Sequence, residues 1–344
     1  MLILAGPTGE GEHIGAEFHP ERPARIGAVM AGVADLHLGD DLVAVPAPLA
    51  PQADLARVHL PSYLEALEAF CLDGGGDLDP DTFAGVDSWA AARRAAGAGL
   101  AAIAALREHD DGVAFVAGRP PGHHAEADRA MGFCLLNNVA VAAASLTAVG
   151  ERVLIVDWDV HHGNGTQSIF WDDPNVLYVS THQWPLFPGT GRAEEIGGPQ
   201  AQGLTVNVPL PAGATGDVVQ LAVEHVAREP IERFSPDWVL VSCGFDAHRS
   251  DPLAELALSC GDFARLAHVV GGFAPRPGRL ALFLEGGYDL RSLRMSVAST
   301  LGSLLGGSDE PEAPTSGGPG SDMVRAARTA RERAMERATG DPGT

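Results

Sequence analysis

The sequence predicts an α/β fold, in which one large domain has a mostly parallel central sheet with helices on both of its faces. The first observation is that short apolar runs rich in Val, Ile and Leu alternate with longer Ala-rich amphipathic stretches along the chain. This alternation is typical of parallel sheets whose strands are joined by helices. The second observation is size, because 344 residues with 45% hydrophobic content can bury a large core.

Seven apolar runs predict the strands, since continuous runs of this length are typical of strands buried on both faces. In chain order they are 42–48, 112–118, 152–159, 175–181, 204–210, 237–244 and 279–287. Helical periodicity fills the intervals. The predicted helices lie near 24–38, 54–71, 88–109, 135–149, 215–233, 261–274 and 289–305.

The chain shows no sign of a domain break before about residue 307. The segment "GGSDEPEAPTSGGPGSD" (306–322) is poor in apolar residues and rich in Gly, Pro and Ser, which is typical of a linker. A helical pattern follows over 323–338. We therefore expect one domain over 1–307 and, over 308–344, a linker with a C-terminal helix that packs on the domain or remains a charged tail.

Composition narrows the class of partners and the compartment. The formal net charge is −22 and all 23 basic residues are arginine, which argues against direct nucleic-acid binding, since phosphate contacts need basic patches. The cysteines form no C-x-x-C pair, so reduced and mostly buried thiols are expected. The N-terminal "MLILAGPTG" lacks a basic n-region, and no run approaches the about 18 apolar residues of a membrane span. These features predict a cytoplasmic protein without a membrane span.

Unusual polar clusters follow four of the predicted strands. In parallel α/β sheets, ligands bind beyond the carboxyl ends of the strands, so these clusters are expected to converge on one crevice. They are "RPPGHHAE" after 112–118, "DWDVHHGNG" within and after 152–159, "FDAHRSDP" after 237–244, and Tyr288 at the end of 279–287.

The cluster "DWDVHHGNG" predicts a metal site. In extended backbone, Asp157, Asp159 and His161 project to one face. Neighbouring buried carboxylates repel each other unless a cation lies between them. Asp and His donors suit zinc or another first-row metal, and Asp246 is the natural third ligand from another strand. A hydrogen-bonded network without a metal is the alternative.

His123, His124 and Tyr288 are candidates for acid–base and oxyanion roles at this crevice. Two imidazoles beside a metal can hold a water, accept its proton and pass a proton to a leaving group. A neutral phenol near a polarised carbonyl can stabilise the developing oxyanion. The alternatives are a solvent-facing turn for the histidine pair and an ordinary half-buried side chain for the tyrosine.

Six motifs together carry a specific family resemblance that extends from about residue 10 to 305. The chain resembles the histone deacetylase superfamily, in its class II and bacterial amidohydrolase branch. The resemblance implies an arginase/deacetylase fold with an eight-stranded sheet, one catalytic zinc, and hydrolysis of an acyl amide on an amine. The motifs are "HPERPARI" (19–26), "RPPGHHAEADRAMGFCLLNNVAVAA" (119–143), "DWDVHHGNGTQSIF" (157–170), "THQWPLFPGTG" (181–191), "CGFDAHRSDPL" (243–253) and "LEGGYDL" (284–290).

The resemblance also implies roles for individual residues. Asp159, His161 and Asp246 match the zinc ligands, in agreement with the pattern of carboxylates and imidazole. His124 matches the general base that later acts as an acid, and His123 matches the electrostatic partner beside it.

Three further positions match residues that support this chemistry. Asp157 corresponds to the carboxylate that orients His123. Asn164 stands where class I members carry the aspartate that orients the general base, as in class II members, and it would leave that base less basic. Tyr288 matches the oxyanion-stabilising tyrosine.

The resemblance further implies a narrow tunnel for an acyl-lysine chain and a second cation. Gly132, Phe133 and Phe187 match the tunnel walls, and Asp81 matches the rim aspartate that grips the substrate backbone. A structural potassium ion would be framed by main-chain carbonyls, namely those of Asp157, Asp159, His161, Ser180 and Thr181.

The function expected from the resemblance is zinc-dependent removal of acyl groups from acyl-lysine in proteins or peptides, or from a small N-acyl amine. The alternative is an acetylpolyamine deacetylase. Leu253 stands where the polyamine-selective branch of the family carries an acidic gatekeeper, which is mild evidence against this alternative. A two-metal ureohydrolase would need an aspartate where Gly163 stands. A non-catalytic acyl-lysine binding module would lack a ligand or the tyrosine, and none is missing.

Overall fold

The central sheet has eight strands, and every pair of neighbouring strands is parallel. The computed structural model describes residues 1–344 except 10, 16–17, 308–310 and 340–344. The strand order is β2-β1-β5-β10-β9-β6-β7-β8, which confirms the predicted parallel sheet. The strands are β1 (Leu2–Ala5), β2 (Leu42–Val45), β5 (Val113–Val116), β6 (Val153–Asp157), β7 (Val176–Gln183), β8 (Thr205–Leu210), β9 (Trp238–Cys243) and β10 (Leu280–Leu284).

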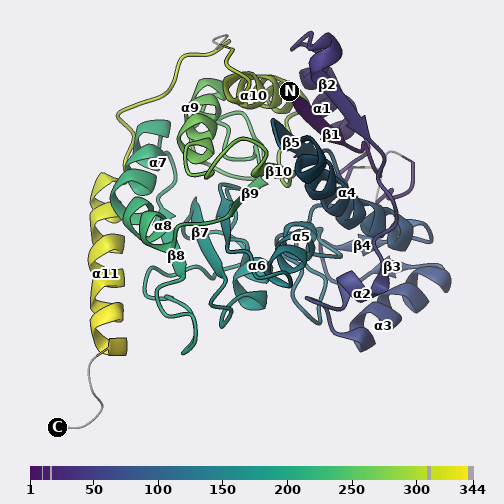
Figure 1. Ribbon diagram of the computed structural model, residues 1–344, viewed down its shortest axis with the longest axis horizontal. Helices are drawn as coiled ribbons and strands as arrows, with labels where there is room; N and C mark the ends of the chain where they lie inside the picture. Colours follow the sequence, from purple (N-terminus) through teal and green to yellow (C-terminus); the bar gives the residue numbers. More distant parts are fainter. Residues whose placement is uncertain (10, 16–17, 308–310, 340–344) are drawn as a thin grey trace.

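Helices cover both faces of this sheet (Figure 1). Alternate strand residues supply the two cores. Leu2 and Leu4 of β1 face one core, and Ile3 and Ala5 face the other, as the two-residue period of a strand requires. The first core contains residues of α1 (Ala24–Ala34), α7 (Gly216–Ala222), α8 (Arg228–Phe234), α9 (Cys260–Gly271) and α10 (Leu290–Leu304). The second contains residues of α2 (Gln52–Leu55), α3 (Pro61–Leu72), α4 (Ser88–His109) and α5 (Asn138–Thr147).

The structure corrects several predicted elements. The N-terminal apolar run forms β1 at the inside of the sheet, a strand that the sequence analysis did not assign. The predicted helix 54–71 is two helices, because α3 begins at Pro61, whose ring suits the first position of a helix. The predicted helix 215–233 contains a π-helical turn, η2 (Val223–Ala227), just before Pro230, which has no N–H to donate to an earlier carbonyl.

Short elements in the connections were also not predicted. They are the 3₁₀ turn η1 (Gly39–Asp41), the two-stranded antiparallel β3 (Gly76–Asp77) and β4 (Phe83–Ala84), and α6 (Asn164–Ile169). Each is too short to give a clear period in the sequence. All four cysteines are free and buried, as expected.

The C-terminal segment lies against the domain. Glu312 forms an ion pair with Arg249 (2.7 Å), and its other carboxylate oxygen lies 3.0 Å from His248 Nε2. The helix α11 (Ser321–Thr339) lies beside α7 and η2 (Figure 1). Arg331 donates hydrogen bonds to the carbonyls of Gly203 and Thr205, both at 2.6 Å. Residues 308–310 and 340–344 of the predicted linker and tail lie outside the described residues. No helix in the described part of the chain combines the length and hydropathy needed to cross a membrane.

Candidate active site

The candidate site lies at the carboxyl ends of four strands that are consecutive in the sheet. His123 and His124 follow β5, Tyr288 follows β10, Asp246 follows β9, and the segment "DWDVHHGNG" begins at the end of β6. Because β5, β10, β9 and β6 are neighbours, residues that are far apart in the sequence meet in one crevice.

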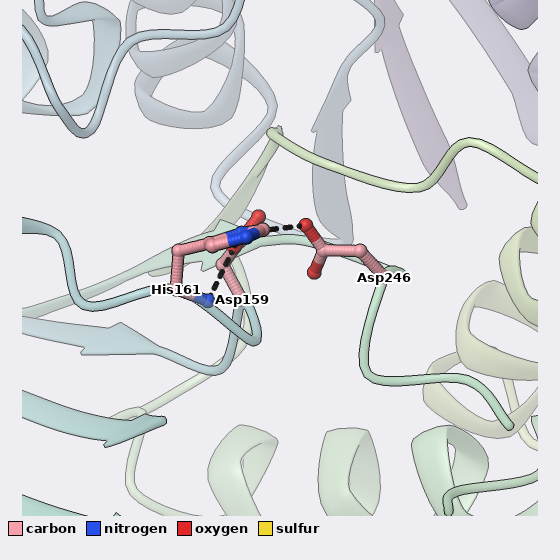
Figure 2. Close-up of side chains that lie close together, drawn as sticks. All are labelled: Asp159, His161 and Asp246. Carbon is pink, nitrogen blue, oxygen red and sulfur yellow. Dashed lines mark hydrogen bonds and ion pairs between the residues drawn. The ribbon is translucent and has the colours of Figure 1, made fainter. Parts of the chain in front are cut away.

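Asp159, His161 and Asp246 form the candidate metal centre (Figure 2). Their potential ligand atoms all lie within 4.8 Å of one another. His161 Nδ1 lies 3.2 Å from Asp159 Oδ1 and 3.2 Å from Asp246 Oδ2. One imidazole nitrogen and two carboxylate oxygens form a donor set that zinc accepts.

The electrostatics of this group favour a bound cation. Burial and the neighbouring Asp159 raise the pKa of Asp246 to about 7. Burial alone would lower the pKa of His161, but hydrogen bonds to Asp159 and Asp246 raise it to about 10. Two buried carboxylates therefore require a positive charge between them, and a divalent ion supplies it more fully than a proton.

Backbone N–H groups hold the remaining oxygens of the two carboxylates. Gly286 donates to Asp159 Oδ2 at 2.8 Å, and Val160 donates to Asp246 Oδ1 at 2.9 Å. A Cβ atom at position 286 would overlap both carboxylates, so only glycine allows this approach. The oxygens opposite His161 are therefore held in place by the protein itself.

His123 lies against a buried carboxylate. Its Nδ1 is 3.0 Å from Asp157 Oδ2, which also accepts a hydrogen bond from the Tyr178 hydroxyl at 3.1 Å. Burial alone would lower the pKa of His123, but the charges of Asp157 and Asp159 raise it well above its ordinary value. The protonated form of His123 is therefore favoured.

His124 lies in a different environment, although its ring is only 4.0 Å from that of His123. Its Nδ1 is 2.8 Å from the amide oxygen of Asn164. Burial and the neighbouring His123 hold the pKa of His124 well below its ordinary value. Opposite shifts in two adjacent groups are typical of an acid–base pair with divided roles.

A cavity of about 230 Å³ connects these groups with the predicted tunnel residues. Tyr288 and Phe133 meet edge to face with their ring centroids 5.8 Å apart, and Phe187 meets His124 in the same way at 5.1 Å. The lining residues are Asp81, Pro121, His123, His124, Gly132, Phe133, His161, Leu186, Phe187, Leu253, Gly286 and Tyr288. All five predicted substrate-binding residues thus line the same cavity as the candidate catalytic groups.

A tight turn presents Phe133 to the cavity. Met131 and Cys134 exchange backbone hydrogen bonds of 3.1 and 2.9 Å, and the residues between them, Gly132 and Phe133, have φ angles of 56° and 68°. Two positive φ angles are the signature of a type I′ turn. For a bulky residue such as Phe133 this conformation is strained, and such strain is concentrated at functional sites.

The side chains around the candidate metal centre do not alternate as they would in a regular strand. β6 ends at Asp157, so the prediction that extended backbone continues through His161 was wrong. Asp157 is not part of the Asp159, His161 and Asp246 group: its Oδ2 lies beside His123, and its Oδ1 accepts the backbone N–H of Asp159 at 3.2 Å. His162 is buried and its ring nitrogens lie 2.8 Å from Thr190 Oγ1 and 3.0 Å from Gln167 Oε1, away from the site.

Ser180 and Thr181 lie on β7 beside the end of β6, where Ser180 is paired with Asp157. The carbonyls named for a potassium ion therefore belong to the end of β6, to the segment that follows it and to the neighbouring part of β7. Their role as ligands of a monovalent cation stays a prediction.

Glu285 and Arg25 are among the buried charged residues of the site that the sequence analysis missed. Glu285 accepts hydrogen bonds from the N–H groups of Gly122 (2.7 Å) and His123 (3.1 Å). Arg25 donates to the carbonyls of Glu285 and Gly287 and lies 5.0 Å from the Tyr288 ring centroid. Both lie inside the motifs "LEGGYDL" and "HPERPARI", where a charge amid apolar neighbours was the available signal.

Comparison with known proteins identifies the family of the chain. The sequence-family model of the histone deacetylase domain matches residues 19–304 of the chain. A probable deacetylase of Methanothermobacter thermautotrophicus is 41% identical over 324 residues, which are 92% of this chain and 95% of that protein. Histone deacetylase 15 of Arabidopsis thaliana is 40% identical over 307 residues, which are 87% of this chain and 55% of the plant protein.

Solved structures give the same result. The crystal structure of the HDA15 HD domain aligns with a TM-score of 0.88 and 34% identity, and the alignment covers 98% of both chains. This agreement confirms the predicted arginase/deacetylase fold. With its parallel sheet, its convergent strand-end residues and these relatives, the chain belongs to the histone deacetylase family.

Proposed function

We propose that the protein is a zinc-dependent deacylase that hydrolyses the amide of an acyl-lysine side chain in peptides or proteins, or of a small N-acyl amine. The observation that carries this proposal is the single cavity lined by His123, His124, His161 and Tyr288. Zinc bound by Asp159, His161 and Asp246 would supply Lewis-acid polarisation of the acyl carbonyl and would acidify water.

The two histidines have different roles in this proposal. His124, neutral in its buried position, accepts a proton from the attacking water and later delivers it to the departing amine. His123 carries positive charge beside Asp157 and stabilises negative charge that develops in the cavity.

Tyr288 and the tunnel residues complete the mechanism. Burial raises the pKa of Tyr288 well above its ordinary value, so the phenol stays protonated and can donate to the oxyanion of the tetrahedral intermediate. Phe133 and Phe187 provide apolar walls that exclude water and accept an alkyl chain.

The proposal is tested by assaying zinc-loaded protein against acyl-lysine peptides, with metal analysis of the same sample. We expect about one zinc per chain and turnover that depends on it. A metal content near two would favour the ureohydrolase alternative. Tight peptide binding without turnover would favour a binding module.

An acetylpolyamine is the second candidate substrate class. Leu253, which stands where the polyamine-selective branch carries an acidic gatekeeper, is one of the residues that line the cavity. An apolar residue there offers no charge to a distal ammonium, which favours acyl-lysine. Comparing kcat/KM for N-acetylspermidine and an acetyl-lysine peptide decides between them. A preference for the polyamine above about a hundredfold, or about 2.7 kcal/mol, would reverse the ranking.

A potassium ion between the end of β6 and the adjacent part of β7, and a cytoplasmic location, belong to the same proposal. Metal analysis for potassium after dialysis against sodium buffer, and fractionation of cells that produce the protein, would test them.

A further inference from the structure

The orientation of one amide decides whether His124 can act as a base, an inference that rests on the proposed function. Asn164 presents Oδ1 to His124 Nδ1 at 2.8 Å. An amide oxygen only accepts hydrogen bonds, so His124 Nδ1 carries the proton and Nε2 keeps its lone pair. If the amide were reversed, its N–H would require an unprotonated Nδ1, and the proton would move to Nε2. His124 could then not accept a proton from water through Nε2.

A carboxylate on the far side of Asn164 selects between these two orientations. Asn164 Nδ2 lies 2.8 Å from Glu126 Oε1. A carboxylate accepts hydrogen bonds and donates none, so the amide must turn its nitrogen toward Glu126. Nδ2 also lies 3.4 Å from the His124 carbonyl oxygen and 3.3 Å from Met131 Sδ. These distances are longer than the distance to Glu126, and both atoms are weaker acceptors than a carboxylate.

The backbone of Glu126 is held from both sides. Its N–H donates to the Arg129 carbonyl at 2.9 Å. Its own carbonyl lies 2.9 Å from His59 Nδ1, while His59 Nε2 accepts the N–H of Asn137 at 2.9 Å. His59 Nε2 is thus the acceptor nitrogen and Nδ1 the donor. These hydrogen bonds fix the loop that holds the Glu126 carboxylate beside Asn164.

We infer that Glu126 is a positioning residue that sets the orientation of the Asn164 amide and, through it, the tautomer of His124. Glu126 is not among the residues that line the cavity, so it acts through Asn164 and not on the substrate. Its second oxygen lies 3.2 Å from Arg129, whose side chain is 60% exposed, and this outer contact is expected to contribute little.

The kinetic test is a double-mutant cycle between Glu126 and Asn164. Glu126→Ala is expected to lower kcat at least about tenfold, or about 1.4 kcal/mol, with KM within about twofold. Glu126→Gln, which can still turn an amide oxygen toward Asn164, is expected to recover most of the loss. The matched control is Arg129→Ala, which removes the exposed contact only and is expected to leave kcat within about twofold.

The background Asn164→Asp makes the test specific. An aspartate has two equivalent oxygens and no orientation to select, and it would lie beside the like charge of Glu126. In this background Glu126→Ala is expected to leave kcat unchanged or to raise it. An equal loss in both backgrounds would mean a purely structural role and would overturn the inference.

A spectroscopic measurement separates this inference from the proposed function. Zinc-loaded protein labelled with ¹⁵N-histidine, without substrate, is expected to show His124 protonated at Nδ1, with the signal assigned by its loss in His124→Gln. Glu126→Ala is expected to shift this signal toward the Nε2-protonated form. An unchanged tautomer in Glu126→Ala would refute the positioning role, even if the protein proves to have another activity.

Discussion

Replacing Glu21 by glutamine tests how the buried charges beneath the site are balanced. Glu21, Arg25 and Arg119 have side chains that are fully buried. The Glu21 carboxylate accepts hydrogen bonds from Arg119 Nε (2.5 Å) and Nη2 (2.6 Å) and from Arg25 Nη1 (3.1 Å). Glutamine keeps the shape of the side chain and removes its charge, so both guanidinium groups lose their carboxylate partner.

Two independent lines of reasoning give the magnitude. Breaking a buried ion pair by removing one partner costs about 3–5 kcal/mol. Burial alone would raise the pKa of Glu21, but the hydrogen bonds and charge of Arg119 lower it from 4.5 to about 2. This difference in pKa corresponds to about 3 kcal/mol of stability at neutral pH. We therefore expect Glu21→Gln to lower the free energy of unfolding by about 3 kcal/mol.

Urea denaturation of both proteins at several pH values measures this effect. Because the pKa of Glu21 is depressed in the folded state, its contribution is complete above pH 4.5 and is lost as the pH falls toward 2. The difference between wild type and variant should therefore shrink over that interval. The matched control is Glu224→Gln, which removes the half-exposed partner of Arg228 and is expected to cost less than about 1 kcal/mol. A loss below about 1 kcal/mol for Glu21→Gln, or a difference that does not depend on pH, would refute the reasoning.

Three further predictions concern pH and the site. Burial lowers the pKa of His59 and His182 from 6.5 to about 4, so the unfolded state takes up protons before the folded state does. The free energy of unfolding should therefore fall by up to about 3 kcal/mol per histidine as the pH drops from 6.5 to about 4. Denaturation curves of His59→Gln should show a smaller dependence of this free energy on pH. Gly286→Ala should abolish zinc retention after dialysis, because the added methyl group overlaps the ligand carboxylates; retained zinc and activity would contradict the assigned geometry. Tyr288→Phe and His124→Ala should each lower kcat about 10²–10⁴-fold in a deacylation assay, and turnover like that of the wild type in both would remove their proposed roles.

The sequence predicted the sheet well because its signal is local and repeated. Strands buried on both faces need continuous apolar residues, and all seven predicted strands are present. β1 was not assigned, because the apolar run at the N-terminus, residues 1–5, is short. The start of α3 at Pro61 could have been predicted, since proline suits the first position of a helix and not its interior. It was missed because the helical periodicity of 54–71 appears continuous.

The candidate site was predictable as a location and, through the resemblance, as a set of residues. The cavity brings together every residue predicted for substrate binding, although what each one does there stays a prediction. The supporting charges of Arg25, Glu285 and Glu126 were not found, because apolar neighbours are only a weak local signal and the contacts of these side chains involve segments far away in the sequence.

By itself, the sequence determined the parallel α/β architecture and the convergence of polar groups at strand ends, since both follow from short-range periodicity and the direction of parallel strands. Only the tertiary structure decided how those groups are paired. Asp159 meets Asp246 across two adjacent strands, while Asp157, two residues away, turns to His123. Glu126 reaches Asn164 from a different loop. Beyond the strand ends the backbone has no period, so side-chain directions there depend on the path of each loop and on the neighbours that pack against it.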